Sequence, residues 1–102
     1  MPVALLEENP VMTPELYDQV RNRLDLETYP AAGLIFHAAG VGLESWVAYD
    51  VWESWAAWDK FLEERLQPAV KEVFTAAGLE TPPPHRQEIF ELHALLVESP
   101  SP

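Results

Sequence analysis

The 102-residue sequence contains no cysteine and only six lysine and arginine residues, against 17 aspartate and glutamate residues. Without cysteine there can be no disulfide, no thiolate nucleophile and no cysteine-ligated metal site. The formal net charge of −11 argues against a nucleic-acid surface and against anionic membranes, because phosphate groups are bound by clustered cations. We therefore expect neither nucleic acid nor a membrane as a partner.

Long apolar segments and a basic leader are also lacking. No apolar run approaches the roughly 20 residues that a bilayer-spanning helix needs. The first four residues, Met-Pro-Val-Ala, lack the basic region of a signal peptide. The sequence has no phosphate-binding loop, no Gly-x-Ser-x-Gly elbow, no His-Glu-x-x-His helix and no calcium-binding loop. We expect a cytoplasmic protein outside those enzyme classes.

Composition predicts one small domain. Hydrophobic residues make up 48% of the chain and charged residues 23%, which is a globular balance. We assign residues 1–102 to a single domain, with a proline-rich connector at 81–85 and a polar tail at 98–102. A domain of this size buries a modest share of its surface, so pairing with a second copy is a natural way to cover more.

Apolar patterns and turn signals predict the first half of the fold. Residues 3–6 form a strand that ends in a turn at 7–10. Thr13 is the N-cap of a helix that has Pro14 at its first position and runs to about residue 24. Residues 34–39 form a second strand bounded by glycines, and the β-prone residues 45–53 form a third.

The second half predicts a long helix and a last strand. Ser54 caps a helix that extends to residue 66, Pro68 starts a separate segment at 69–77, and residues 88–97 form the fourth strand. The order βαββαβ is the α+β ferredoxin-like arrangement, a four-stranded antiparallel sheet in the order 4-1-3-2 with helices on one face. Apolar residues on the other face call for a second sheet as cover.

His37 and Asp50 are the candidate catalytic pair. If His37 opposes Ala48, alternation puts one set of side chains on the same face: Ile35, His37, Trp46, Ala48, Asp50 and Trp52. A neutral imidazole in an aromatic cavity can take a proton from a phenol or an acidic carbon, and a carboxylate can orient it. A one-residue slip would instead put His37 on the face of Tyr49 and Val51.

Structural roles remain open for the same residues. A strand histidine often makes a hydrogen bond in a core or an interface, and a hydrogen bond would equally satisfy Asp50. His93 falls on the last strand, which is expected to lie roughly 14 Å from the second strand at ~4.8 Å per strand step. Within one subunit, His37 and His93 therefore cannot share a metal. His85 follows three prolines and is expected in a solvated loop. We predict no metal site, and we read Trp58 first as core and second as a pocket wall.

Four segments carry a family resemblance: Gly33-Leu34-Ile35, His37-Ala38-Ala39-Gly40, Asp50-Val51-Trp52-Glu53-Ser54 and Phe61-Leu62-Glu63-Glu64-Arg65-Leu66-Gln67-Pro68. The chain resembles small proteins of the dimeric α/β-barrel superfamily, near the antibiotic-biosynthesis-monooxygenase-like group, over roughly residues 3–97. One departure is Trp55, which stands where relatives tend to carry a charged or polar residue. The resemblance implies a homodimer with an apolar or aromatic small molecule as ligand.

The resemblance implies two activities for a pocket between sheet and helices. One is cofactor-free oxygenation of an electron-rich aromatic such as an anthrone or a quinol, and the other is isomerisation or cyclisation by a histidine base. Besides the catalytic pair, the expected substrate-binding residues are Phe36, Trp46, Tyr49, Trp52, Trp58 and His93. No cofactor is expected, with haem held by His37 or His93 as an alternative. A non-catalytic dimeric binding or stress-associated protein, or a purely structural dimer, are the non-enzyme readings.

Overall fold

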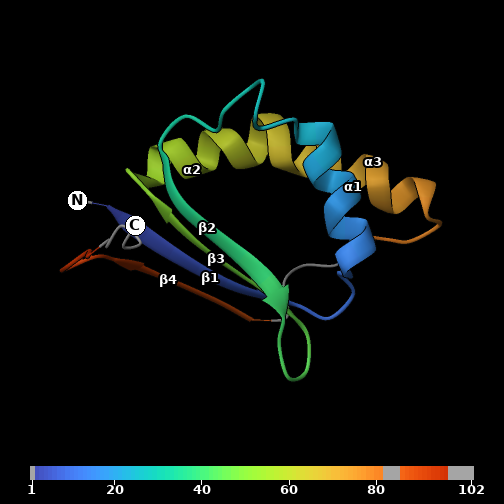
Figure 1. The fold of residues 1–102 in the computed structure, drawn as a ribbon, viewed down its shortest axis with the longest axis horizontal. Coiled ribbons are helices and arrows are strands. Elements are labelled where there is room, and N and C mark those ends of the chain that lie inside the picture. Colours follow the sequence, from blue (N-terminus) through green and yellow to red (C-terminus); the bar gives the residue numbers. More distant parts are fainter. Residues whose placement is uncertain (1, 82–85, 97–102) are drawn as a thin grey trace, which may run out of the picture.

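The computed structural model describes residues 2–81 and 86–96, which form one antiparallel sheet beneath a layer of helices (Figure 1). The strands lie in the order β2-β3-β1-β4, and every neighbouring pair is antiparallel. This is the order predicted from the sequence. The strand bounds are β1 Val3–Asn9, β2 Leu34–Val41, β3 Trp46–Trp52 and β4 Arg86–Glu91.

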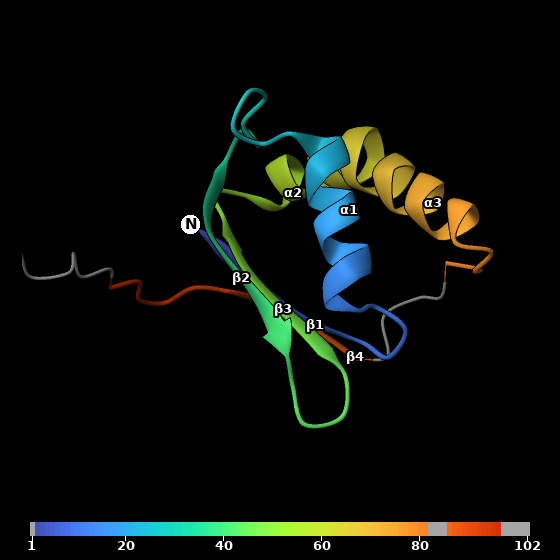
Figure 2. The ribbon, with the colours of Figure 1, turned by 45° about the vertical axis from the view of Figure 1, so that its right-hand side comes forward.

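The helices cover one face of the sheet (Figures 1 and 2). They are α1 (Pro14–Leu24), α2 (Trp55–Phe61), a π-helical turn η1 (Leu62–Leu66) and α3 (Gln67–Ala76). Both predicted N-caps are present, because the Thr13 hydroxyl accepts from the third helical N–H at 3.1 Å and the Ser54 hydroxyl does the same at 3.1 Å. No helix in residues 2–81 and 86–96 is both long and apolar enough to cross a membrane.

Pro68 does not separate two helical segments as predicted. The segments α2, η1 and α3 follow one another without a break, and Pro68 is at the second position of α3. Proline has no N–H to donate, and its ring crowds the carbonyl one turn earlier. The wider π turn lies directly before it, where Gln67 N–H donates to the carbonyl of Leu62, and this shift of the hydrogen-bond ladder accommodates the ring.

The ends of β1 and β4 differ most from the prediction, because pairing partners set them. The expected turn at residues 7–10 is wrong, since β1 is central and continues to Asn9 with β3 along one side and β4 along the other. The last strand was expected at 88–97 but ends at Glu91, which pairs with the first residue of β1. Leu92 N–H donates to the Pro2 carbonyl at 2.9 Å, and beyond this point β1 offers no further partner.

The buried core lies on the helix-facing side of the sheet. One cluster joins the inner face of the strands to α2: Val3, Leu5, Trp52 and Trp58. The other packs α1 against α3: Leu16, Val20, Leu24, Ala69, Val73 and Phe74. The predicted core role of Trp58 is therefore confirmed, and Trp55 packs, partly buried, at the edge of the first cluster.

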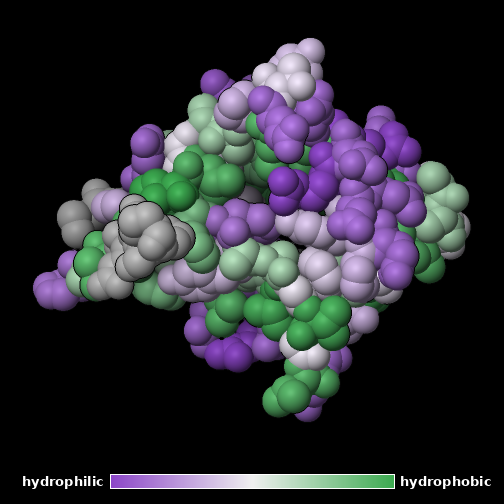
Figure 3. Space-filling model, viewed as in Figure 1, coloured by the Kyte–Doolittle hydropathy of each residue, from purple (hydrophilic) through white to green (hydrophobic). Residues whose placement is uncertain are grey.

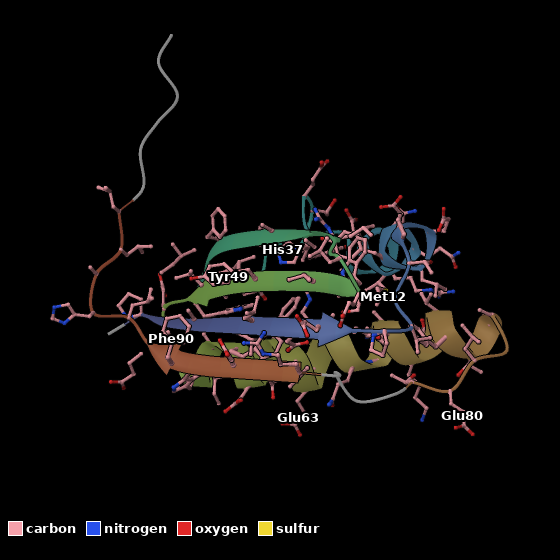
Figure 4. All side chains as sticks on the ribbon, turned by 90° about the horizontal axis from the view of Figure 1, so that it is seen from below. Met12, His37, Tyr49, Glu63, Glu80 and Phe90 are labelled. Carbon is pink, nitrogen blue, oxygen red and sulfur yellow. The ribbon has the colours of Figure 1, made fainter. Side chains whose placement is uncertain are left out.

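Among the described residues, no helix lies over the opposite side of the sheet. Figure 4 looks onto this outer face, with Tyr49 and Phe90 labelled and the helices behind the strands. Phe36 packs edge-on against Tyr49 with ring centroids 6.1 Å apart, yet Phe36 and Phe90 are each 45% exposed. At one end of the sheet the β2–β3 hairpin tip protrudes with Val41 and Leu43 exposed (Figure 3).

Candidate functional site

His37 on β2 lies directly opposite Asp50 on β3. The predicted partner of His37, Ala48, pairs instead with Ala39, so the true register differs by two residues. A two-residue shift keeps every side chain on its predicted face, because the strand period is two. The exception is Ile35, which falls in an irregularity of pairing between Leu34 and Phe36 and is 40% exposed, so it does not join the His37 face.

The two side chains make direct contact. Nδ1 of His37 is hydrogen-bonded to Oδ1 of Asp50, and the second carboxylate oxygen accepts from Nε1 of Trp52 at 3.2 Å. An ionised carboxylate only accepts, so the neutral imidazole carries its proton on Nδ1 and leaves Nε2 as the acceptor. The side chains of His37 and Asp50 are 23% and 14% exposed, which leaves the pair within reach of a ligand.

Tyr17 on α1 supplies the partner of the second ring nitrogen. Its hydroxyl donates to Nε2 of His37 at 2.5 Å and accepts from a guanidinium N–H of Arg21 at 3.1 Å. The Arg21 guanidinium also lies 5.9 Å from the centroid of the Tyr17 ring. A continuous hydrogen-bonded chain therefore runs from Arg21 through Tyr17 and His37 to Asp50, and joins α1 to the edge strand β2 and its neighbour β3.

Sequence reasoning missed Tyr17 and Arg21. Their spacing of four residues places them on one side of α1, which is a signal that they act together. Nothing in the sequence says that this side of α1 lies over β2, because that depends on how α1 packs against α3. Tyr17 follows the buried Leu16 and is itself half-buried.

Three of the predicted aromatic residues surround the hydrogen-bonded chain that runs from Arg21 to Asp50. Trp46 packs against Tyr17 with ring centroids 4.9 Å apart. Trp52 donates to Asp50 and packs against Trp58, whose ring centroid is 5.6 Å away. Trp46 and Trp52 thus contact the chain directly, and Trp58 supports it from behind.

The other predicted substrate-binding residues lie elsewhere. Phe36 and Tyr49 project from the outer face of the sheet, because they alternate with His37 and Asp50 along their strands. His93 is exposed and follows β4 at the opposite edge of the sheet from β2. The structure therefore does not bring these three residues together with His37 and Asp50, and their substrate-binding role stays a prediction. His85 lies outside the described residues.

Glu7 is a second carboxyl on the helix-facing side that the sequence did not single out. It pairs with Ala48 on one side and Gln87 on the other, and the Gln87 amide donates to it at 3.2 Å. Burial raises the pKa of Glu7 above its ordinary value of 4.5; the Gln87 hydrogen bond opposes this rise and the nearby Asp50 carboxylate adds to it. The predicted turn at this position concealed it.

The described residues offer no place for a metal and do not fit a haem on His37. In residues 2–81 and 86–96, no three His, Asp or Glu side chains gather closely enough to hold a metal ion. Both ring nitrogens of His37 are engaged, one by Asp50 and one by Tyr17, so neither is free to bind iron. His93 is exposed rather than enclosed in a pocket.

A hollow on the helix layer is a weaker candidate for a site. It lies between α1 and α3, and its charged side chains are already paired. Arg23 forms an ion pair with Glu72 at 2.9 Å, and Arg65 donates to the backbone carbonyls of Leu24, Tyr29 and Pro30 at 2.7 to 3.0 Å. Arg65 therefore fixes the connection between α1 and β2, which is a structural role.

The sheet order and one-sided helix layer define the α+β ferredoxin-like fold of the antibiotic-biosynthesis-monooxygenase-like proteins, as the resemblance implied. No protein-family model matches the sequence. A search of curated proteins also finds no match.

Several solved structures are similar to this chain over nearly its whole length. A proposed antibiotic biosynthesis monooxygenase from Chloroflexus aurantiacus is 12% identical, with 94% of this chain and 97% of that chain covered and a TM-score of 0.62. SnoaB, a cofactor-independent oxygenase from Streptomyces nogalater, is 17% identical over 95% and 97%, with a TM-score of 0.59. The heme-degrading protein Rv3592 of Mycobacterium tuberculosis is 17% identical over 94% and 99%, with a TM-score of 0.56. The TM-scores show that these proteins share a fold with this chain, and at identities this low the similarity shows the fold alone.

Proposed function

We propose that this protein binds an electron-rich aromatic or quinol-like molecule on the helix-facing side of its sheet and oxygenates it without a cofactor. The observation that carries the proposal is the hydrogen-bonded chain from Tyr17 through His37 to Asp50. In this chain the His37 imidazole is the proton acceptor. The His37–Asp50 pair is partly exposed, and Trp46 and Trp52 pack beside the chain. Acid–base groups of this kind contribute about 10² to 10⁴ in rate to proton transfer.

Proton removal is the step that the protein would supply. A reduced polycyclic phenol such as an anthrone loses a proton from its acidic methylene or its hydroxyl, and the resulting electron-rich anion reduces dioxygen. One oxygen atom enters the substrate as a carbonyl and the other leaves as water. The imidazole receives the proton, and the Asp50 carboxylate stabilises the imidazolium that forms.

The structural neighbours support this chemistry over haem chemistry. SnoaB is described as a cofactor-independent oxygenase, and it shares the fold over nearly the whole chain. The heme-degrading neighbour shares the fold as well, but here both nitrogens of His37 already have partners. The site is thus better suited to moving protons than to binding iron.

Isomerisation or cyclisation is the second candidate, because such reactions need only proton transfer and the hydrogen-bonded His37 is a proton acceptor. A non-catalytic binding protein would use the same aromatic walls without turnover. Oxygen consumption separates these readings from oxygenation, and conversion of a substrate without oxygen uptake separates an isomerase from a binder.

A homodimer completes the proposal. The outer face of the sheet presents partly exposed Phe36 and Phe90 beside Tyr49, and no helix of the described residues covers it. Apolar sheet faces are stable when a second layer covers them. A second copy of this chain, packed sheet against sheet, would do so, and we place the dimer in the cytoplasm.

The test is oxygen uptake by the purified, metal-free protein with a panel of reduced polycyclic phenols and quinols. Wild type, His37→Ala and Asp50→Asn are compared, with Tyr49→Phe on the outer face as the control. Uptake that depends on the protein, falls by about 10² in His37→Ala and survives in Tyr49→Phe supports the proposal. Absence of uptake with every compound contradicts it.

A further inference from the structure

We propose that Tyr17, and not His37, is the group that takes the proton from the substrate. The substrate in this inference rests on the proposed function, but the activation of Tyr17 does not. The starting observation is that the imidazole has no nitrogen left for a ligand. Nδ1 donates to Asp50 and Nε2 accepts from the Tyr17 hydroxyl.

The Tyr17 oxygen is the atom of the chain that can still accept. A phenolic hydroxyl has one proton and two lone pairs. The proton is directed at His37, and one lone pair accepts from Arg21 at 3.1 Å. The second lone pair is available to a ligand hydroxyl or an acidic C–H, and Tyr17 is half-buried rather than enclosed.

The proton transfer balances without any other reactant. The O–H or C–H bond of the substrate breaks and its proton joins the Tyr17 oxygen, while the original Tyr17 proton passes to Nε2 of His37. Tyr17 ends unchanged, the substrate carries a negative charge, and the imidazolium is stabilised by the Asp50 carboxylate. The Arg21 guanidinium, beside the Tyr17 oxygen, stabilises the negative charge during the transfer.

The arrangement has the logic of a Ser-His-Asp triad with a phenol in the place of the serine. In such a triad the histidine acts through the hydroxyl that it activates, and the carboxylate fixes the tautomer. Here Asp50 holds Nδ1 and Trp46 holds the Tyr17 ring at 4.9 Å between centroids. His37 and Asp50 are on this view positioning residues, and Tyr17 is the catalytic residue.

Acetylation by N-acetylimidazole tests the activation without any substrate. The phenol oxygen attacks the acetyl carbon while its proton passes to Nε2 of His37. The bond from the acetyl carbon to the imidazole nitrogen of the reagent then breaks, and His37 returns the proton to this leaving nitrogen. The chain has three tyrosines, and Tyr29, which is 64% exposed, is the internal reference. Peptide mapping by mass spectrometry gives the rate at each tyrosine.

We expect Tyr17 to react faster than Tyr29 despite its lower exposure. His37→Gln should slow Tyr17 by about tenfold or more while the rate at Tyr29 stays the same. A Tyr17 rate below that of Tyr29 in wild type, or one unaffected by His37→Gln, overturns the inference. Circular dichroism of each variant verifies that the fold is retained.

Tyr17→Phe then distinguishes the inference from the proposed function. The variant keeps the ring but lacks the hydroxyl, and His37 regains a free Nε2. If wild type consumes oxygen and Tyr17→Phe loses about 10² of that rate, both hold. If Tyr17→Phe keeps the full rate, His37 is the base and the inference fails while the proposed function stands. If no compound is oxygenated but Tyr17 is acetylated fastest in a His37-dependent way, the proposed function fails and the inference stands.

Discussion

The hydroxyl of Tyr17 on α1 donates to Nε2 of His37 on β2, so two residues 20 positions apart share one proton. The contact joins the helix layer to the sheet at the candidate site. On the far side of the imidazole, Nδ1 is hydrogen-bonded to Asp50. The predictions below test the groups around this contact and the faces of the sheet that carry it.

Trp52→Phe should lower activity through Asp50. The substitution removes the indole N–H that donates to the carboxylate at 3.2 Å but keeps an aromatic ring in the core. A hydrogen bond to a charged group contributes about 1.5 to 3 kcal/mol, so turnover is expected to fall by roughly 10-fold or more. Trp58→Phe is the matched control, since it leaves a similar cavity beside Trp52 without touching Asp50. Equal activity losses in the two variants would contradict the role of the indole N–H.

Glu7→Gln should alter the pH dependence of stability. The folded protein holds the Glu7 pKa above its ordinary value of 4.5, so the folded state keeps this proton more tightly than the unfolded state. The associated stability is fully present below the unfolded pKa and is lost as pH rises through the raised folded pKa. Denaturant unfolding from pH 4 to 8 should therefore show wild type losing stability relative to Glu7→Gln with rising pH.

The exposed Glu63→Gln is the control for this series. Its difference from wild type should stay nearly constant over the same pH range. A constant difference for Glu7→Gln as well would show that the carboxyl is not selectively destabilised in the folded state.

Phe90→Glu should dissociate the proposed dimer. Phe90 is 45% exposed on the outer face of the sheet, and a charge there would be buried without a partner in a sheet-to-sheet interface. Light scattering after size exclusion is expected to give the monomer mass at concentrations where wild type is dimeric. Leu43→Glu, at the exposed hairpin tip, should remain dimeric. A monomeric wild-type protein would refute the interface directly.

Gly33→Ala should destabilise the fold where β2 begins. Gly33 has φ +89°, and an added Cβ would lie 2.6 Å from the Cβ of Ala57 on α2. Backbone strain of this kind costs about 1 to 3 kcal/mol, and the clash adds to it. Gly40→Ala is the control, because nothing lies within 4 Å of an added Cβ there. Thermal unfolding should show a clear loss for the first variant and little change for the second.

Local signals in the sequence predicted the elements, and nonlocal pairing decided their ends. Thr13 and Ser54 mark the starts of their helices, because each hydroxyl accepts a hydrogen bond from the backbone N–H only three residues later. The end of β4 could not be read locally, because it depends on where β1 starts, more than 80 residues earlier in the chain.

The candidate site was half predictable for a related reason. Alternation along the strands placed His37 and Asp50 on one face. A register error of two residues, or of any even number, leaves this placement unchanged. Tyr17 required knowledge of how α1 crosses the sheet, which depends on the packing of Val20 and Leu24 against α3. Helix packing is set by side-chain shape across many residues and leaves no short motif.

The helix layer has a mechanical consequence for ligand binding. The buried residues of α1 pack on α3, whereas Tyr17 reaches the sheet through His37 and Trp46. A ligand that breaks the hydrogen bond between the Tyr17 hydroxyl and His37 would therefore also weaken the attachment of α1 to the strands. Ligand binding at the site would then change the hydrogen-exchange rates of the backbone amides along α1.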